Sequence, residues 1–137
     1  MFLTKERLNF YDCDPAGIIF YASLLKIAHT AYEKFLAEIS PGRNFFFDEE
    51  IVLPIIHCEA DYYKPLKAFD VIDVSVIVKE VRDNSFELNY KFEIDNKMYA
   101  EAKTVHVCVD KKKFEKTILP EQLKLKLNEN LMPRMRE

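Results

Sequence analysis

Apolar residues recur at every third or fourth position between residues 21 and 39, which predicts one long amphipathic helix. The charged residues Lys26 and Glu38 lie off this apolar stripe. At 3.6 residues per turn the segment makes about five turns, enough to cross a small sheet. Pro41-Gly42 follows directly and predicts the end of the helix. The apolar positions are Tyr21, Leu24, Leu25, Ala28, Tyr32, Phe35, Leu36 and Ile39.

Alternating apolar and polar residues elsewhere in the chain predict β-strands. The clearest case is 86–94, where aromatic and aliphatic side chains alternate with polar or charged ones. The predicted strands cover residues 2–11, 55–63, a segment after Asp70 that includes 72–78, 86–94 and 98–110. The remaining predictions are a loop or short helical piece at 43–54, turns at 82–85 and 95–97, a second helix at 120–131 and a frayed tail at 132–137.

This order of elements predicts an α+β fold. One strand precedes the long helix, and four strands joined mostly by short turns follow it. We therefore expect a five-stranded antiparallel sheet wrapped around one long central helix. Ala100 and Ala102 on the last strand leave room for a bulky neighbour such as the helix. The length of 137 residues predicts a single domain spanning 1–137.

Composition and charge narrow the classes of function. Hydrophobic residues make up 49% and charged residues 31% of the chain, a globular mixture. The formal net charge of −3 gives no nucleic-acid-binding footprint. No apolar run approaches the ~18 residues of a membrane helix, and none follows residues 5–7 as in a signal peptide. Cys13, Cys58 and Cys108 show no CxxC spacing, which favours a reduced, cytoplasmic setting.

The scarcity of glycine argues against several enzyme classes. The chain has two glycines, Gly17 and Gly42, which lie too far apart for a P-loop. A dinucleotide-binding fingerprint needs three close glycines. The Gly-x-Ser-x-Gly nucleophile elbow is also missing. Nucleoside triphosphatases, Rossmann dehydrogenases and α/β-hydrolases thus lose their usual motifs.

The segment 9–21 joins the first predicted strand to the helix and carries the candidate chemistry. Pro15 fixes its own φ and pushes Asp14 into an extended conformation, and Gly17 permits a backbone angle that other residues avoid. These residues predict a sharp bend that holds a carboxylate beside the unpaired N–H groups of the helix start. This arrangement suits acyl transfer. An Asp-Pro pair before a helix is also common as plain turn and cap chemistry.

Neighbouring polar residues have structural interpretations. Asp12 alternates with Asp14 and is expected to face away from the site. Cys13 has no basic partner nearby in sequence, so we expect a packed thiol rather than a nucleophile. His29 borders the apolar stripe of the helix, and we predict a core histidine there.

Two further residues share a face of the last predicted strand. His106 and Cys108 both have metal-binding side chains, but two ligands are too few for a metal site. We therefore expect packed side chains at both positions and predict no metal site. Glu33 on the helix is expected to be solvated or to lie in an interface.

Residues 11–21, Tyr-Asp-Cys-Asp-Pro-Ala-Gly-Ile-Ile-Phe-Tyr, closely resemble the active-site segment of hotdog-fold acyl-CoA thioesterases of the 4-hydroxybenzoyl-CoA thioesterase family. Residues 27–36, 53–62 and 106–110 resemble the subgroup that hydrolyses 1,4-dihydroxy-2-naphthoyl-CoA. The similarity covers nearly the whole chain. It implies the hotdog fold, in which the sheet wraps around the long helix.

The resemblance assigns catalytic roles within the bend. Asp14 falls on the family's catalytic carboxylate, and Gly17 on its bend glycine. Tyr21 falls where a backbone amide at the helix start polarises the thioester carbonyl. The Tol-Pal-type thioesterases have a histidine next to this position, whereas this chain has Phe20 and Ala22. That subgroup therefore fits less well.

The resemblance also suggests substrate contacts. Phe20 lies beside the helix start, and His57 lies on a strand that approaches the partner's acyl pocket in related dimers. The 4-hydroxybenzoyl enzymes hold CoA phosphates with a basic run of which only Arg82 remains here. Residues 45–47, three phenylalanines, either cap an aromatic acyl pocket or pack in the core or a dimer interface. Candidate replacements for the missing cations are Lys64, Lys67 and the turn 111–113.

The implied activity is hydrolysis of an acyl-CoA thioester, with an aromatic acyl group. Asp14 either attacks the carbonyl directly or activates water. The resemblance implies no cofactor, since coenzyme A is part of the substrate, and an assembly as a homodimer or homotetramer. We expect no nucleic-acid or membrane partner. The alternatives are a short- or medium-chain fatty acyl-CoA thioesterase and a hotdog module that binds acyl-pantetheine without cleaving it.

Overall fold

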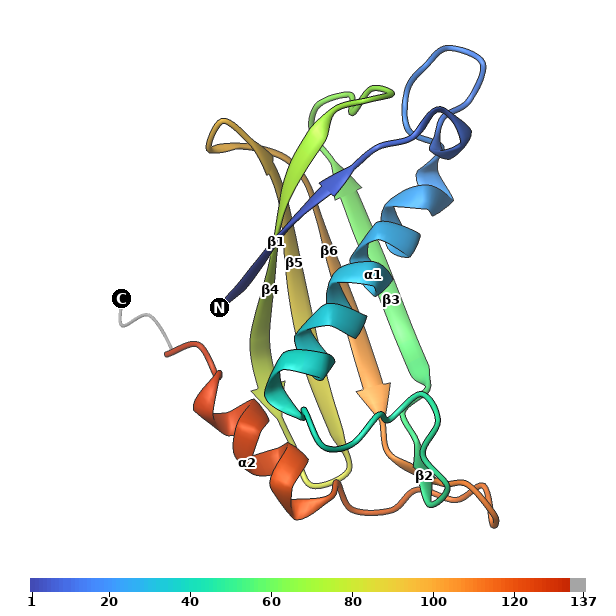
Figure 1. Ribbon diagram of the computed structural model, residues 1–137, viewed down its shortest axis with the longest axis vertical. Helices are drawn as coiled ribbons and strands as arrows, with labels where there is room; N and C mark the ends of the chain where they lie inside the picture. The colour runs from blue at the N-terminus through green and yellow to red at the C-terminus, as the bar shows by residue number, and fades with distance from the viewer. Residues whose placement is uncertain (134–137) are drawn as a thin grey trace.

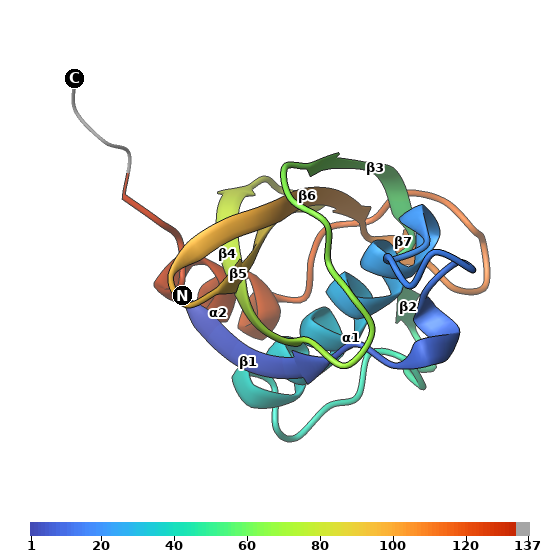
Figure 2. The same cartoon turned by 90° about the horizontal axis from the view of Figure 1, so that it is seen from above.

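The computed structural model of the protein describes residues 1–133 and contains one curved five-stranded sheet with a long helix along its inner face (Figures 1 and 2). The sheet order is β1-β4-β5-β6-β3, and all neighbouring strands are antiparallel. Its elements are β1 (Phe2–Arg7), α1 (Tyr21–Ile39), β3 (Ile55–Tyr62), β4 (Val71–Val81), β5 (Ser85–Ile94) and β6 (Lys97–Val107). The arrangement confirms the predicted α+β fold and the extent of the long helix.

The core lies between α1 and the inner face of the sheet. The inward residues of β5, predicted from alternation, are almost fully buried. Ala100 and Ala102 are buried too, and they pair with Tyr62 and Ala60 on the same face of the sheet. These small side chains leave space beneath α1, as expected. The core side chains of β5 are Phe86, Leu88, Tyr90 and Phe92.

The two sides of α1 face different strands. On one side Lys34 forms a 2.6 Å ion pair with Glu6 of β1. On the other side the hydroxyl of Tyr62 on β3 donates a hydrogen bond to the carbonyl of Tyr21. The helix therefore bridges the two edge strands of the sheet, with its first turn tied to β3.

The predicted first strand is too long, because the chain leaves the sheet after Arg7. Residues 10–12 form a 3₁₀ turn, η1 (Phe10–Asp12), which a capping box stabilises. The Asp12 carboxylate accepts the N–H of Asn9 at 2.9 Å, and the Asp12 N–H donates to the Asn9 carbonyl at 3.0 Å. These local bonds replace the pairing that the prediction extended to residue 11.

The predicted last strand is interrupted. β6 ends at Val107, and after Cys108 the chain forms the short strand β7 (Val109–Asp110), which pairs with β2 (Ile51–Val52). The second helix, α2, spans Glu121–Glu129.

The beginning of the predicted tail is ordered against the sheet. Met132 donates its N–H to the carbonyl of Val78 at 3.1 Å, and Leu131 bridges to the same residue. The prediction of a frayed tail is therefore wrong at residue 132. Its last part, residues 134–137, lies outside the described residues.

The edge strand β3 is exposed along almost its whole length. Within residues 1–133, no strand pairs with the edge of β3 that faces away from β6. Long unpaired edges invite pairing with another chain. None of the helices described is long and apolar enough to cross a membrane.

Candidate active site

The bend before α1 is a tight hairpin. The N–H of Asp14 donates to the carbonyl of Ile18 at 2.9 Å, and the N–H of Gly17 donates back to the carbonyl of Asp14 at 2.9 Å. Gly17 has φ of 76°, which L side chains rarely adopt. Pro15 occupies the second position of the turn, where its fixed φ is favourable. The turn chemistry of the sequence thus produces the predicted sharp bend.

Neighbouring segments fix this hairpin in place. The N–H of Phe20 donates to the carbonyl of Asp12 at 2.9 Å, which anchors its second arm to η1. The segment 66–68 runs along the other side and makes two backbone hydrogen bonds with it. These are Ile19 N–H to the Leu66 carbonyl at 2.8 Å and Ala68 N–H to the Gly17 carbonyl at 3.1 Å.

The carboxylate of Asp14 lies on the exposed side of the hairpin. Its Oδ1 accepts the N–H of Ala16 at 2.9 Å, which fixes the orientation of the group. Among the described residues, none donates a hydrogen bond to Oδ2. One oxygen therefore orients the carboxylate, and the other is available to a reactant.

The start of α1 has no side-chain cap. Phe20 is the N-cap residue, and its carbonyl accepts the N–H of Ser23 at 2.8 Å. The N–H of Tyr21 finds no acceptor in the part of the chain that the structure describes. Unpaired N–H groups at a helix start carry partial positive charge and bind anions or carbonyl oxygens.

A groove of about 340 Å³ lies against this helix start. Asp14 lies beside it, because the main chain of Asp14 is hydrogen-bonded to Ile18, one of the lining residues. Tyr62 and Tyr63 were not among the predicted site residues, although both line the groove. The aromatic pair at the end of a predicted strand was the available signal. The groove is lined by Ile18, Ile19, Tyr21, Tyr62, Tyr63, Lys64 and Pro65.

Neither Asp12 nor Cys13 joins the candidate site. Asp12 is buried and caps η1, which agrees with the structural role expected for it. The pKa of the Cys13 thiol is raised by burial and by the charges of Asp12 and Asp14. A thiol that keeps its proton is a poor nucleophile.

The predicted substrate contacts lie in different places. Phe20 is half-exposed beside the helix start, with its ring centroid 4.7 Å from that of Tyr21. Arg82 lies in the β4–β5 turn, at the opposite end of the sheet (Figure 1), 2.7 Å from Glu80. Within one chain, therefore, Phe20 is near Asp14 and Arg82 is not.

His57 lies on the outer face of the sheet, away from α1. It pairs with Val105, whereas Tyr62, which contacts the helix, is on the other face of β3. Its Nε2 lies 3.5 Å from the Glu59 carboxylate. Within one chain, His57 is consequently separated from the groove by the sheet itself.

The prediction of a core histidine at position 29 is wrong. His29 is half-exposed at the side of α1, and its Nδ1 lies 2.9 Å from the carboxylate of Glu33. Its ring lies beside those of Tyr32 and Phe46, so this position is at the border of the core and not inside it. Glu33 itself is exposed, as expected.

The buried histidine is His106. Its Nε2 shares a 2.8 Å hydrogen bond with Thr104, whose hydroxyl also contacts Tyr90 at 2.9 Å. Burial lowers the pKa of His106 to about 3, so the imidazole is neutral at pH 7. Cys108 contacts the carbonyl of Ile118 instead, at 3.6 Å, so the two side chains do not meet.

The candidate phosphate-binding cations separate into two locations. Lys64 lines the groove, and Lys67 bridges to Ile18 in the hairpin. The turn 111–113 lies elsewhere, since Lys111 donates to the carbonyl of Asp48 at 2.9 Å beside β2. The structure thus brings only the first two lysines close to the helix start.

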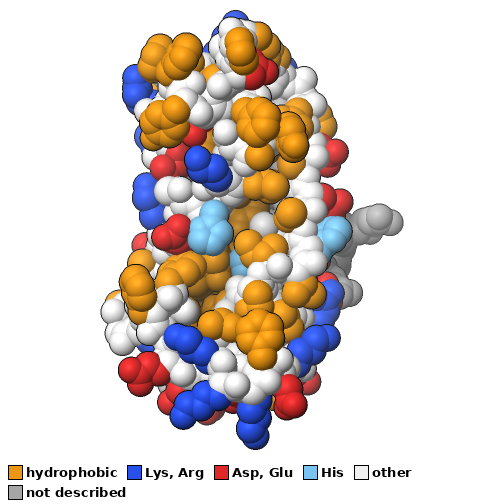
Figure 3. Space-filling view, turned by 90° about the vertical axis from the view of Figure 1, so that its right-hand side faces the viewer, with side chains coloured by type: hydrophobic (Ala, Val, Ile, Leu, Met, Phe, Trp, Pro, Cys, Tyr) orange, Lys and Arg blue, Asp and Glu red, His pale blue; other side chains and the backbone are white. Residues whose placement is uncertain are grey.

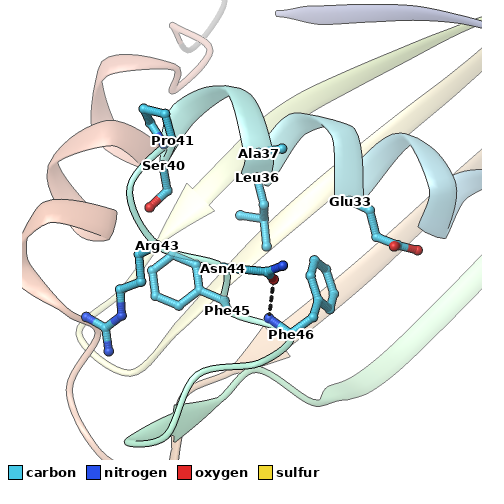
Figure 4. Close-up of a pocket in the computed structure, with 9 residues that line it drawn as sticks. All are labelled: Glu33, Leu36, Ala37, Ser40, Pro41, Arg43, Asn44, Phe45 and Phe46. Atoms are coloured by element: carbon cyan, nitrogen blue, oxygen red, sulfur yellow. Dashed lines mark hydrogen bonds between the residues drawn. The ribbon is translucent and has the colours of Figure 1, made fainter.

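A second cavity, of about 360 Å³, lies at the other end of α1 (Figure 4). It is formed by the last two turns of the helix and the loop that follows. Its lining mixes polar side chains, among them Glu33 and Asn44, with the ring of Phe46. This cavity is remote from Asp14 in the same chain.

Comparisons with known proteins identify the family of this chain. Residues 8–127 match the family model of the thioesterase-like superfamily. A 1,4-dihydroxy-2-naphthoyl-CoA hydrolase from Microcystis aeruginosa is 39% identical over 121 residues, which cover 87% of this chain and 88% of that protein. The chain belongs to the thioesterase-like superfamily. The predicted thioester hydrolase class is confirmed.

Solved structures show the same fold. A gentisyl-coenzyme A thioesterase superposes with a TM-score of 0.82 at 25% identity, covering 91% of this chain and 98% of that one. A 1,4-dihydroxy-2-naphthoyl-CoA thioesterase from Synechocystis superposes with a TM-score of 0.84 at 23% identity, covering 93% and 95%. The hotdog fold expected from the resemblance is therefore confirmed.

Proposed function

We propose that the enzyme hydrolyses an acyl-CoA whose acyl group is a hydroxylated aromatic ring, with Asp14 as the catalytic carboxylate. The observation that carries the proposal is the hairpin, which holds Asp14 beside a groove at the uncapped start of α1. The names of the relatives support the choice of substrate, since 1,4-dihydroxy-2-naphthoyl and gentisyl groups are both hydroxylated aromatic acyl groups.

In the proposed reaction the thioester carbonyl oxygen faces the N–H of Tyr21. Attack on the carbonyl carbon moves an electron pair onto that oxygen, and the N–H with the helix dipole stabilises the negative charge. A donor of this kind contributes roughly 3 kcal/mol to transition-state stabilisation in other enzymes. Collapse of the tetrahedral intermediate breaks the carbon–sulfur bond and releases coenzyme A as a thiolate.

Asp14 takes one of two roles in the proposed reaction. As a nucleophile, its Oδ2 forms a mixed anhydride that water then opens. As a general base, it removes a proton from the water that attacks the thioester. Unlabelled acid from a single turnover in H₂¹⁸O would identify Asp14 as the nucleophile, with water opening the anhydride at the aspartyl carbon. Labelled acid is expected from a general base and also from an anhydride opened at the acyl carbon.

The finer assignments belong to the same proposal. Lys64 and Lys67 hold the phosphates of coenzyme A, since they lie beside the groove and no ion pair engages them within residues 1–133. The reaction uses water and no cofactor besides the coenzyme A of the substrate. The exposed edge of β3 pairs two chains into a homodimer, which stacks into a homotetramer. The enzyme works in the cytoplasm.

The decisive experiment measures free-thiol release from a panel of acyl-CoAs, with Asp14→Asn assayed alongside. Hydroxybenzoyl- and dihydroxynaphthoyl-CoA should be cleaved fastest, and the variant should lose nearly all turnover. Preference for straight-chain substrates would favour the fatty acyl-CoA alternative. Tight binding of acyl-CoA without thiol release from any substrate would leave a binding module.

A further inference from the structure

One face of the molecule carries exposed apolar side chains at both ends. Figure 3 views the molecule from the side of β3 and shows apolar side chains at both ends and along the middle, with a hollow beside a histidine side chain. The first group surrounds the hairpin and the start of α1. The second surrounds the loop after α1. The exposed apolar residues of the two ends are Ile18, Phe20, Tyr21 and Tyr62, and Phe46, Phe47, Ile55 and Ile56.

The loop after α1 carries three phenylalanines and is held in place by hydrogen bonds. Arg43 binds the Asp48 carboxylate through two hydrogen bonds of 2.5 and 2.9 Å, which close the loop. Phe45 is buried, and the guanidinium carbon of Arg43 lies over the Phe45 ring, 5.0 Å from the ring centroid. The N–H of Phe46 donates to Asn44 at 2.9 Å (Figure 4).

The last two phenylalanines of this loop face outward. The ring of Phe46 lies 5.7 Å from that of Tyr32 and 5.9 Å from that of His29, on the β3 side of α1. Phe47 is 82% exposed and contributes nothing to the core of its own chain. Phe46 and Phe47 belong to the exposed apolar group at this end of the face, together with Ile55 and Ile56. Contiguous exposed apolar patches mark binding surfaces, whereas single exposed side chains do not.

Pairing of two β3 edges brings the two ends of this face together. In an antiparallel pair related by a two-fold axis, the Tyr62 end of one strand lies beside the Ile55 end of the other. The hairpin is tied to the Tyr62 end through Tyr21. The loop precedes the Ile55 end by a few residues. In such a pair each hairpin would face the loop of the other chain.

We propose that Phe46 and Phe47 of each chain form a wall of the acyl pocket of the other chain, opposite Asp14 and Tyr21, and that this wall selects flat aromatic acyl groups. The inference rests on the proposed thioesterase function and on the β3 dimer. The groove beside Tyr21 is open in a single chain, and the second copy closes it. Aromatic rings pack face to edge or offset on one another, so two phenylalanine rings discriminate a planar acyl group from a flexible one.

The first test compares substrates. Phe47→Ala should lower kcat/KM about tenfold for an aromatic acyl-CoA while changing a straight-chain acyl-CoA far less. Leu125→Ala, at an exposed apolar residue on α2, is the control and should change neither value. Phe47→Leu keeps an apolar side chain but lacks the ring, so it should also lose the preference for aromatic substrates. Sedimentation of both variants shows whether they remain dimers. A loss of preference in an intact dimer is then due to the missing ring.

The second test shows which chain supplies the ring. Asp14→Asn and Phe47→Ala chains are co-expressed with different affinity tags and purified as the mixed dimer. In that dimer the intact Asp14 faces an intact Phe47 from the other chain, so activity on the aromatic substrate should return to about half the wild-type value. A mixed dimer no more active than the Phe47→Ala homodimer would overturn the proposal.

The outcomes separate this inference from the proposed function. If Asp14→Asn remains active on aromatic acyl-CoAs, the proposed function fails. If Asp14→Asn is inactive but Phe47→Ala and Phe47→Leu keep wild-type selectivity, the function stands and the aromatic wall is wrong.

Discussion

The two ends of α1 differ in how their backbone groups are hydrogen-bonded. At its C-terminal end the Ser40 N–H donates to the Leu36 carbonyl at 2.9 Å, and the Arg43–Asp48 pair closes the loop behind it. At its N-terminal end Phe20 provides no side-chain cap. Helix ends usually find partners in capping side chains or turns. One end is thus closed by hydrogen bonds, whereas at the other end the Tyr21 N–H has no acceptor within residues 1–133.

The difference follows from the residues at each end. A Ser, Thr, Asp or Asn at the N-cap would satisfy one of the free N–H groups, typically stabilising the helix by about 1 kcal/mol. Phe20 forgoes that stabilisation, and Asp14 lies across a hairpin instead of at the cap. The negative charge that a helix start attracts is thus held nearby without occupying the donors.

Asp14→Asn is the strongest test of the proposed catalytic role of the N-terminal end of α1. We expect kcat to fall about 10³-fold, in the range found for lost general bases. The exposed position should leave the unfolding midpoint nearly unchanged, because the amide oxygen can still accept the N–H of Ala16. Thiol release and thermal unfolding measured on the same sample check both parts. Activity within tenfold of wild type would remove Asp14 from the mechanism.

Gly17→Ala tests whether the hairpin geometry matters to the chemistry. An added Cβ would meet no atom within 4 Å, so the cost comes from φ of 76° alone. A left-handed conformation costs an L residue roughly 1–2 kcal/mol. We expect that loss in the free energy of unfolding, together with a drop in kcat as the hairpin relaxes. Gly42→Ala is the matched control, since Gly42 has open space and no positive φ. A fall in stability without a fall in kcat would show that the hairpin only supports the fold.

Asp48→Asn tests the C-terminal end. The Arg43 guanidinium holds the pKa of this carboxyl below its usual range, since its hydrogen bond favours the charged form. Because the pKa of Asp48 is lower in the folded than in the unfolded state, its charged carboxylate stabilises the fold at pH values above the unfolded-state pKa. This stabilisation is lost as the pH falls through the folded-state pKa. The variant should therefore unfold about 1–3 kcal/mol more easily at pH 7. The gap should narrow as the pH is lowered below 4. Denaturant titrations at several pH values check this, and a gap that widens in acid would contradict it.

The smallest expected effect is that of Cys13→Ala. The raised pKa keeps this thiol protonated at pH 7, and no proposed step uses it. We expect kcat within about twofold of wild type, as for substitutions away from the reacting atoms. The steady-state rate with the aromatic substrate measures it. A loss comparable to that of Asp14→Asn would make Cys13 a catalytic group.

Sequence patterns predicted the regular elements well where periodicity is strong, as in α1 and β5. They failed where a few local hydrogen bonds decide the path of the chain. The capping box between Asn9 and Asp12 ends β1 early, and Cys108 interrupts the last strand. Neither feature alters hydrophobic alternation, so neither is visible in it.

The candidate site was predictable in its turn chemistry but not in its three-dimensional setting. Pro15 and Gly17 dictate the hairpin that holds Asp14, and these residues are evident in the sequence. The face of the sheet on which His57 lies depends on which side of β3 contacts α1 and on a register shift between Ile55 and His57. The contacting side of β3 and the register shift both result from tertiary packing, and the sequence of one strand alone does not predict them.

The contact between Tyr62 and Tyr21 joins the exposed edge strand to the start of the long helix. The same residue that ends the exposed edge strand also grips the first turn of α1. If two chains pair at this edge as proposed, movement of the edge would be transmitted to the peptide group proposed to polarise the thioester. Such a dimer should lose specific activity on dilution, as its subunits separate, before it loses any secondary structure.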